Sequence, residues 1–311
     1  MHGARGKKVS TRLRDECACA REHKSIAVAA TDRRPTIKND WQQLGGVTPT
    51  ALAEARINLH YAAQIVSGVG RTWAPKRDDD SHTNLGWRSD LGGLVSRSAQ
   101  QQPALSAGLD FSGLQLLLLD DGNRTVAERS LADTTLDHGY RWLQRELAQR
   151  WGSETGDVAP LHYDMPDHEL GRGAVFRRET PEAFAELARW FGNASTVLER
   201  VREEHGSSPV RCWPHHFDLA TLISLGDDRS IGVGLTPGDE SCAEPYFYVG
   251  PWPHPTPARW PELAAGSWHT DGFVAAVLTG SELVAALNQA KALDAFLDSA
   301  IEASRTLLQK S

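Results

Sequence analysis

Hydrophobic positions along the chain switch between a helical and a strand period from about residue 45 to residue 311. Apolar residues recur at helical spacing in four segments, 51–67, 135–151, 181–201 and 281–311. Short alternating or continuous apolar runs predict strands at 91–97, 109–120, 125–130, 217–225, 230–236 and 245–249. Strands and helices therefore share the chain, and both element types must appear in the fold.

The order of these elements is similar in the two halves of the chain, because each half has a meander of strands followed by a helix. This order predicts an α+β fold with mainly antiparallel sheets covered by helices. We place the two similar halves at about 45–205 and 206–311, within a single domain. Residues 1–44 are basic and polar without a sustained period, and we predict a disordered N-terminal tail there.

Charge and composition narrow the possible partners. The net charge of −7 disfavours binding to nucleic acid or to anionic lipid through overall charge. No apolar run is long enough to span a bilayer, and no apolar signal-peptide segment follows the basic N-terminus. Four cysteines in 311 residues do not form a disulfide framework. We expect a cytoplasmic protein whose partner is a small molecule, with no nucleic acid and no membrane.

The densest group of reactive side chains is the segment 212–218, CWPHHFD, directly before a predicted strand. Side chains alternate across a strand, which puts Phe217 on an apolar face and His216 and Asp218 on the other face. Register must keep the apolar faces of neighbouring strands together. The opposite face is then predicted to collect His216, Asp218, Ala220, Gly232, Gly234, Thr236, Glu244, Tyr246 and Tyr248.

Gly232 and Gly234 would leave a gap in this second face. Glycine inside a strand often marks the close approach of a ligand or of another backbone. With acidic, imidazole and phenol groups around the gap, the face is typical of a small-molecule pocket. Alternatively, a helix or the other sheet fills the gap, and His216 and Asp218 form a hydrogen-bonded pair under a loop.

A second polar cluster lies at 81–87, SHTNLGW. In extended chain, His82 and Asn84 would share one side and Trp87 would lie on the other. The cluster is either a polar turn that leads into a strand or part of the pocket wall. The predicted substrate-binding residues are His82, Asn84, Trp87, Trp213, Gly232, Gly234 and Glu244.

Two kinds of catalysis fit these residues. Imidazole and carboxylate ligands suit a divalent metal such as zinc. The predicted ligands are His215, His216, Asp218, Glu240 and Glu244, with His82 or His162 as a further ligand, or the alternative set Cys212, His215 and Cys242. Without a metal, general acid–base catalysis would use His216 oriented by Asp218, with Tyr246 or Tyr248 as a proton donor.

A non-catalytic role is the third possibility. Trp213, Trp252, Trp260 and Trp268, together with the tyrosines, could line an aromatic cleft for a small ligand or a peptide. The chain carries neither a GxSxG nucleophile elbow nor a phosphate-binding glycine loop ahead of a helix.

Three segments resemble an uncharacterised bacterial protein family, a domain of unknown function: 79–87 (DDSHTNLGW), 213–222 (WPHHFDLATL) and 232–252 (GVGLTPGDESCAEPYFYVGPW). The resemblance implies a soluble bacterial protein and adds no chemistry. Two hypotheses therefore stand: an enzyme, with or without a metal, that acts on a small polar substrate, and a binding module for a small ligand or peptide.

Overall fold

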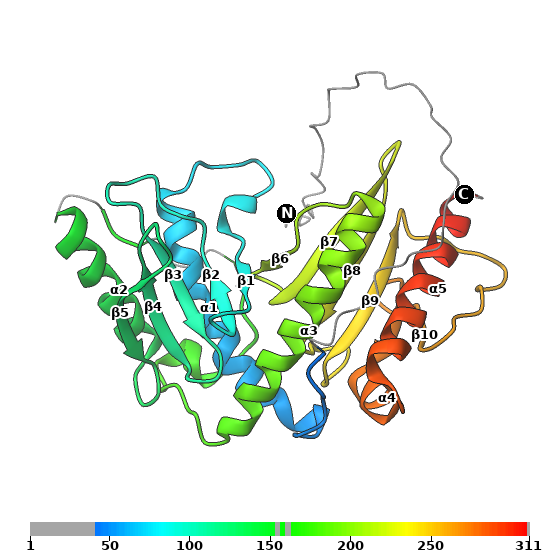
Figure 1. The fold of residues 1–311 in the computed structure, drawn as a ribbon, viewed down its shortest axis with the longest axis horizontal. Helices are drawn as coiled ribbons and strands as arrows, with labels where there is room; N and C mark the ends of the chain where they lie inside the picture. Colours follow the sequence, from blue (N-terminus) through cyan, green and yellow to red (C-terminus); the bar gives the residue numbers. More distant parts are fainter. Residues whose placement is uncertain (1–40, 153–155, 159–162, 310–311) are drawn as a thin grey trace, which may run out of the picture.

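Two antiparallel sheets, each with helices against one face, make up the α+β fold (Figure 1). The computed structural model describes residues 41–152, 156–158 and 163–309. The segment 1–40, which holds nearly all of the predicted tail, lies outside these ranges. Among the helices of the described ranges, none is both long and apolar enough to cross a bilayer.

The first sheet is a five-stranded meander in the order β1-β2-β3-β4-β5. Its strands are β1 (Gly86–Arg88), β2 (Gly93–Val95), β3 (Ser106–Asp110), β4 (Gln115–Leu119) and β5 (Thr125–Ser130). The helices α1 (Ala53–Trp73) and α2 (Leu136–Trp151) pack against β3 and β4. Short 3-10 turns lie at η1 (Pro49–Leu52), η2 (Ser81–Thr83) and η3 (Glu169–Arg172).

The single strand predicted at 109–120 is wrong, because a turn divides it into β3 and β4. Leu114 in this turn has a left-handed backbone, with φ of 49°. Both Phe111 and Leu114 are fully buried. The apolar ends of this turn, Phe111 and Leu114, extend the apolar pattern of the flanking strands, although Ser112 and Gly113 between them are typical turn residues.

The second sheet has six strands in the order β10-β11-β9-β8-β7-β6. Its strands are β6 (Arg211–Trp213), β7 (Asp218–Gly226), β8 (Arg229–Thr236), β9 (Tyr246–Trp252), β10 (Ser267–His269) and β11 (Ala275–Thr279). The helix α3 (Pro181–His205) packs on β7 and β8, and α5 (Gln289–Gln309) packs on β8, β9 and β11. The predicted last helix is two helices, α4 (Gly280–Ala285) and α5, separated at the fully exposed Leu287.

The two sheets lie side by side at their edge strands, β1 and β6. Leu85 and Cys212 exchange two backbone hydrogen bonds of 2.9 Å beside β1 and β6. One core cluster extends through both sheets and includes residues of α1, α3 and α5. The helix α3, which precedes residue 205 in the sequence, packs on β7 and β8 of the second sheet.

Residues 41–44, which the sequence places at the end of the tail, belong to the packed body instead. Leu44 is buried, and its backbone N–H donates to Gln289 Oε1 at 3.0 Å while its carbonyl accepts from Gln289 Nε2 at 3.0 Å. Trp41 Nε1 donates to the same Gln289 oxygen at 3.2 Å. The glutamine at the start of α5 therefore holds this segment much as a neighbouring strand would.

Candidate functional site

The reactive segment is a tight turn anchored by Phe217. The backbone N–H groups of His216 and Phe217 both donate to the Trp213 carbonyl, at 3.1 and 2.7 Å. Phe217 has φ of 58°, a left-handed conformation that is rare for a bulky residue. Its side chain is buried and stacks on the His60 ring at 5.1 Å. Core packing thus holds the turn in a conformation that the backbone alone disfavours.

This turn overturns the predicted position of His216. The strand β7 begins at Asp218, so strand alternation does not reach the two histidines. His215 and His216 are exposed at the turn, with ring centroids 4.2 Å apart. Although the His215 side chain reaches solvent, its partial burial, followed by the His216 charge, lowers the pKa of His215 to about 4.

Two side chains of helix α1 hold the turn through its Pro214 carbonyl. The Pro214 carbonyl lies 2.9 Å from His60 Nε2 and accepts from Gln64 Nε2 at 2.6 Å. Gln64 Oε1 in turn accepts from the Tyr163 hydroxyl at 2.6 Å. Burial lowers the pKa of His60 to about 4, so the ring is neutral at neutral pH, and Nε2 carries the proton because a carbonyl can only accept.

The predicted strand register is present in the second sheet. Ala220, Gly234 and Tyr248 are direct neighbours across β7, β8 and β9, and Leu222, Gly232 and Gly250 form the adjacent row. The apolar residues of these strands point to the other face and lie in the core: Leu219, Ile223, Ile231, Val233, Leu235, Phe247 and Val249.

The ring of Tyr248 fills the gap over Gly234. A Cβ atom at Gly234 would lie 2.6 Å from the Tyr248 hydroxyl oxygen and 2.7 Å from Cζ. At Gly232 the nearest atoms to such a Cβ are 3.9 Å away. Neither a helix nor the other sheet takes the space over Gly234, which a side chain of the same face occupies.

Tyr248 crosses Gly234 to reach Asp218. Its hydroxyl donates to Asp218 Oδ2 at 2.6 Å. Asp218 is buried, and its Oδ1 has no hydrogen-bond partner within the described residues. A buried polar atom without a partner is uncommon and calls for an explanation. The hydrogen bond predicted between His216 and Asp218 is absent from the described contacts, because His216 lies in the turn before β7 and its side chain is exposed.

Burial sets the protonation of this pair. It raises the pKa of Asp218, while the Tyr248 hydrogen bond and the nearby His216 act in the opposite direction. Burial also raises the pKa of Tyr248 well above its usual value, and the Asp218 charge adds to this effect. Tyr248 therefore stays a neutral donor, and the Asp218 carboxyl holds its proton to a higher pH than an exposed aspartate would.

Tyr246, the other predicted donor, is committed to the loop between β8 and β9. Its hydroxyl donates to Asp239 Oδ2 at 2.6 Å, and burial raises its pKa. Asp239 Oδ1 accepts from the backbone N–H groups of Ser241 and Cys242, at 2.8 and 3.0 Å. These bonds give Tyr246 a role in holding the loop.

The predicted metal ligands are not brought together. Glu244 Oε2 accepts from the backbone N–H of Ser281 at 2.7 Å and from its hydroxyl at 2.6 Å, at the start of α4. Glu240 is exposed in the loop, and His162 lies outside the described residues. Over 41–152, 156–158 and 163–309, no group of three His, Cys, Asp or Glu side chains is placed to hold a metal ion.

The side chains of the cluster at 81–87 make hydrogen bonds and packing contacts within the fold. Residues 81–83 form a 3-10 turn rather than extended chain, and His82 Nδ1 accepts from the Arg77 backbone N–H at 3.3 Å. The buried Asn84 accepts from Arg97 Nε at 3.0 Å. Trp87 packs in the core, 5.3 Å from Phe111. These contacts support the polar-turn interpretation over the pocket-wall interpretation.

The tryptophans do not form one cleft. Trp213 lies in β6 and Trp268 in β10, at opposite edges of the second sheet. Trp260 packs against Trp268 at 4.8 Å, and Trp252 against His254 at 4.9 Å. Of these four tryptophans, Trp213 lies beside the reactive turn, 6.1 Å from the His215 ring, where Tyr163 also packs at 5.6 Å.

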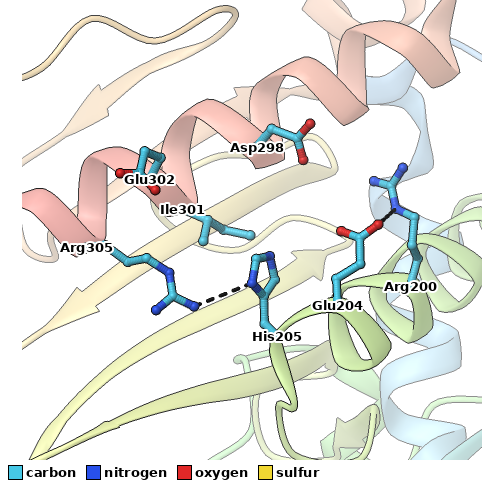
Figure 2. Close-up of a pocket in the computed structure, with 7 residues that line it drawn as sticks. All are labelled: Arg200, Glu204, His205, Asp298, Ile301, Glu302 and Arg305. Atoms are coloured by element: carbon cyan, nitrogen blue, oxygen red, sulfur yellow. Dashed lines mark hydrogen bonds and ion pairs between the residues drawn. The ribbon is translucent and has the colours of Figure 1, made fainter. Parts of the chain in front are cut away.

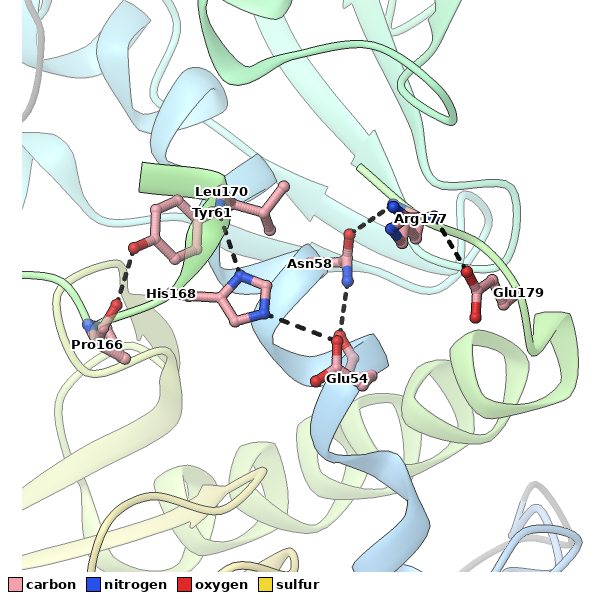
Figure 3. Close-up of polar contacts among 8 residues, drawn as sticks. All are labelled: Glu54, Asn58, Tyr61, Pro166, His168, Leu170, Arg177 and Glu179. Carbon is pink, nitrogen blue, oxygen red and sulfur yellow. Dashed lines mark hydrogen bonds and ion pairs between the residues drawn. The ribbon is translucent and has the colours of Figure 1, made fainter. Parts of the chain in front are cut away.

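The sequence analysis did not predict the polar contacts that side chains of α1 make. Besides the contacts of His60 and Gln64 to the turn, a second set lies near the start of the helix (Figure 3). Asn58 Oδ1 accepts from the Arg177 backbone N–H at 2.9 Å. The Tyr61 hydroxyl donates to the Pro166 carbonyl at 2.8 Å. His168 Nε2 lies 3.7 Å from Glu54 Oε2. The available signal was a series of polar residues within an otherwise apolar helix, each of which needs a partner once buried.

No protein-family model, curated protein or solved structure matches this chain. The resemblance to an uncharacterised bacterial family therefore rests on the three sequence segments alone. The function has to be argued from the arrangement of the side chains.

Proposed function

We propose that the protein is an enzyme that transfers a proton to or from a small polar substrate at the Asp218–Tyr248 pair. The observation that supports this most is the Asp218 carboxyl group, which is buried with one oxygen held by Tyr248 and the other without a described partner. A general acid or base is most effective when its pKa lies near the working pH. Burial moves the pKa of Asp218 in that direction.

The three side chains would have different roles. Asp218 exchanges the proton through Oδ1. Tyr248 donates to Oδ2 and so orients the carboxyl group. His216, exposed beside the pair, is available to bind a polar or anionic group of the substrate. Three residues of the predicted site, His216, Asp218 and Tyr248, thus retain a role in this proposal. Tyr246 and a metal ion have none.

A substrate would approach from the side of the sheet that α3 and α5 leave open. Asp218 Oδ1 is shielded from solvent, so binding must shift part of its cover. Catalytic contacts commonly tighten only when the substrate is bound.

Ligand-observed NMR with small carboxylic acids, amides, amines and sugars tests the proposal. We expect compounds that bind the wild type to lose binding in Asp218→Asn, and at least one of them to be converted by the wild type over time. Asp120→Asn, in an exposed turn of the first sheet, is the matched control and should bind as the wild type does. Equal binding to wild type and Asp218→Asn contradicts the proposal, while Asp218-dependent binding without conversion favours the non-catalytic binding module.

A further inference from the structure

Two arginines, Arg97 and Arg211, lie close together at the junction of the two sheets. The backbone bonds that join the sheets at Leu85 put Gly86 opposite Arg211, and a Cβ atom at Gly86 would lie 3.8 Å from Arg211 Nη1. Arg97 Nε donates to Asn84 Oδ1 at 3.0 Å. Asn84 and Gly86 are two positions apart in extended chain and point to the same side. Both guanidiniums therefore lie on one side of this junction.

The Asp218–Tyr248 pair lies on the same face of the second sheet as Arg211. Residues directly opposite each other on antiparallel strands point to the same face. Arg211 in β6 is opposite Ala220 in β7, and Trp213 is opposite Asp218. Ala220 belongs to the row that leads across β8 to Tyr248. The two arginines thus border the candidate site on the side of the first sheet.

Neither guanidinium is neutralised by a carboxylate of the described chain. Both side chains are half-buried, a setting in which arginine is usually paired. Arg97 uses Nε for Asn84, and Arg211 Nη1 donates to the Val210 carbonyl at 2.8 Å. Over residues 41–152, 156–158 and 163–309, no carboxylate forms an ion pair with either arginine. Several N–H donors of each guanidinium are therefore available to a ligand.

The charges around Arg97 leave this cluster positive. Burial, followed by the charges of Arg211 and Arg77, lowers the pKa of Arg97, while Asp79 acts in the opposite direction. Asp79 Oδ1 accepts from the Ser81 backbone N–H at 3.0 Å. Three arginines thus share one aspartate, which is itself held by the start of η2. An anion at this position would offset the remaining positive charge.

The arginines between α3 and α5 are in a different setting. A cavity of about 410 Å³ lies there, and Arg200 and Arg305 line it together with three carboxylates (Figure 2). These are Glu204, Asp298 and Glu302. Since both signs of charge line that cavity, its arginines do not call for an anionic ligand. The arginines at the sheet junction do.

We propose that Arg97 and Arg211 bind the phosphate group of a small phosphate monoester. The phosphate site follows from the arginines alone, while its identification as part of the substrate rests on the proposed function of Asp218. A phosphate monoester carries about two negative charges at neutral pH, which matches two guanidiniums, and its oxygens suit their forked donors. A carboxylate carries one charge and needs only one of them. Trp213 lies between Asn84 and Asp218, where its ring contacts the organic part.

Calorimetric titration of the full chain with inorganic phosphate and with glycerol phosphate tests this site. Salt at about 0.15 M screens charges that are not in contact with the ligand. We expect saturable binding of both compounds, with acetate and glycerol weaker by about tenfold or more, because they lack the paired charge-assisted contacts. Arg97→Gln and Arg211→Gln should each weaken phosphate binding by about tenfold or more.

Arg88→Gln is the matched control. Arg88 lies on the same side of β1 as Gly86, but its Nε donates to Asp90 Oδ1 at 2.9 Å, so its charge is already neutralised. The change removes one positive charge from the same region and should leave phosphate binding nearly unchanged. An equal loss in all three variants would show a general effect of net charge and would overturn the proposal. So would the absence of saturable phosphate binding, or unchanged binding in both Arg97→Gln and Arg211→Gln.

Asp218→Asn separates this site from the proposed function, because phosphate should still bind to that variant. Phosphate binding through the arginines, without conversion of any phosphate monoester by the wild type, would support the site and contradict the proton transfer. Ligands that depend on Asp218, in a protein that does not bind phosphate, would do the reverse. If the glutamine variants do not fold, Arg97→Lys and Arg211→Lys replace them, since lysine keeps the charge and removes the fork.

Discussion

Replacing Asp218 with asparagine should change how the stability of the protein depends on pH. The change keeps the shape of the side chain, and the amide oxygen can still accept from the Tyr248 hydroxyl. It removes the one titrating group of the pair that burial pushes toward neutral pH. The pH dependence of stability therefore reports on the titration of Asp218 more directly than stability at one pH does. At a single pH, the buried amide N–H groups of the asparagine also change stability, because they need hydrogen-bond acceptors.

The sign of the effect follows from the direction of the shift. In the unfolded chain Asp218 titrates near its ordinary value of 3.8, and burial raises its pKa in the folded state. Between these two values the folded protein holds a proton that the unfolded chain has released. The free energy of unfolding of the wild type, relative to Asp218→Asn, must then fall as pH rises. Its limiting slope is about 1.4 kcal/mol per pH unit, and it levels off above the folded pKa.

Urea unfolding followed by circular dichroism between about pH 4 and pH 8 measures this difference. A difference that is flat, or that rises with pH, would refute the view that Asp218 is a desolvated acid. Asp120→Asn provides a control that should show no pH dependence over this range. Its hydrogen bonds to Arg124 lower the pKa of Asp120 from its ordinary value of 3.8, so the stability that it contributes is complete at pH 4 and above and is lost only as pH falls through the folded pKa.

Two further predictions concern packing around the pair, and thermal and urea unfolding check both. Gly234→Ala should destabilise the protein by about 1–3 kcal/mol, since its Cβ would lie 2.6 Å from the Tyr248 hydroxyl oxygen, whereas Gly232→Ala, with 3.9 Å of clearance, should stay within about 0.5 kcal/mol. Equal effects of the two variants would contradict the position of the Tyr248 ring. Phe217→Ala should cost about 3–5 kcal/mol, because the fully buried ring leaves a cavity at the centre of the core, and a loss below about 1 kcal/mol would contradict that burial.

The strands that could be predicted are those with one apolar and one polar face. β7, β8 and β9 alternate over most of their length, and only one register keeps Leu219, Leu235 and Phe247 together. The strand predicted at 109–120 failed for the opposite reason. Phe111 and Leu114 are apolar turn residues that point into the core, and they hide a turn that Asp110, Ser112 and Gly113 mark in the sequence, with the Gly113 N–H donating to Asp110 Oδ2 at 3.1 Å.

The candidate site was predicted in part. Alternation placed Asp218, Gly234 and Tyr248 on one face, and the structure has them there. The sequence could not show that the Tyr248 ring fills the gap over Gly234, because a gap above a glycine accommodates a ligand and a neighbouring ring equally well. Nor could the sequence show that Phe217 adopts a left-handed backbone, which removes His216 from the strand.

Asp218, whose side-chain Oδ1 has no described partner, lies in a backbone segment that is fixed on both sides. On one side the buried Phe217 ring and the two α1 contacts to the Pro214 carbonyl hold the turn, and on the other side β7 pairs with β6 and β8. A buried carboxyl oxygen without a partner costs about 1–3 kcal/mol or more. A mobile loop would rotate it into water. Here the surrounding contacts prevent that movement, so the cost persists in the folded state, as it does where strain is retained at functional sites. Binding of a hydrogen-bonding group at Oδ1 would recover this energy, which gives a ligand a physical reason to bind at Asp218.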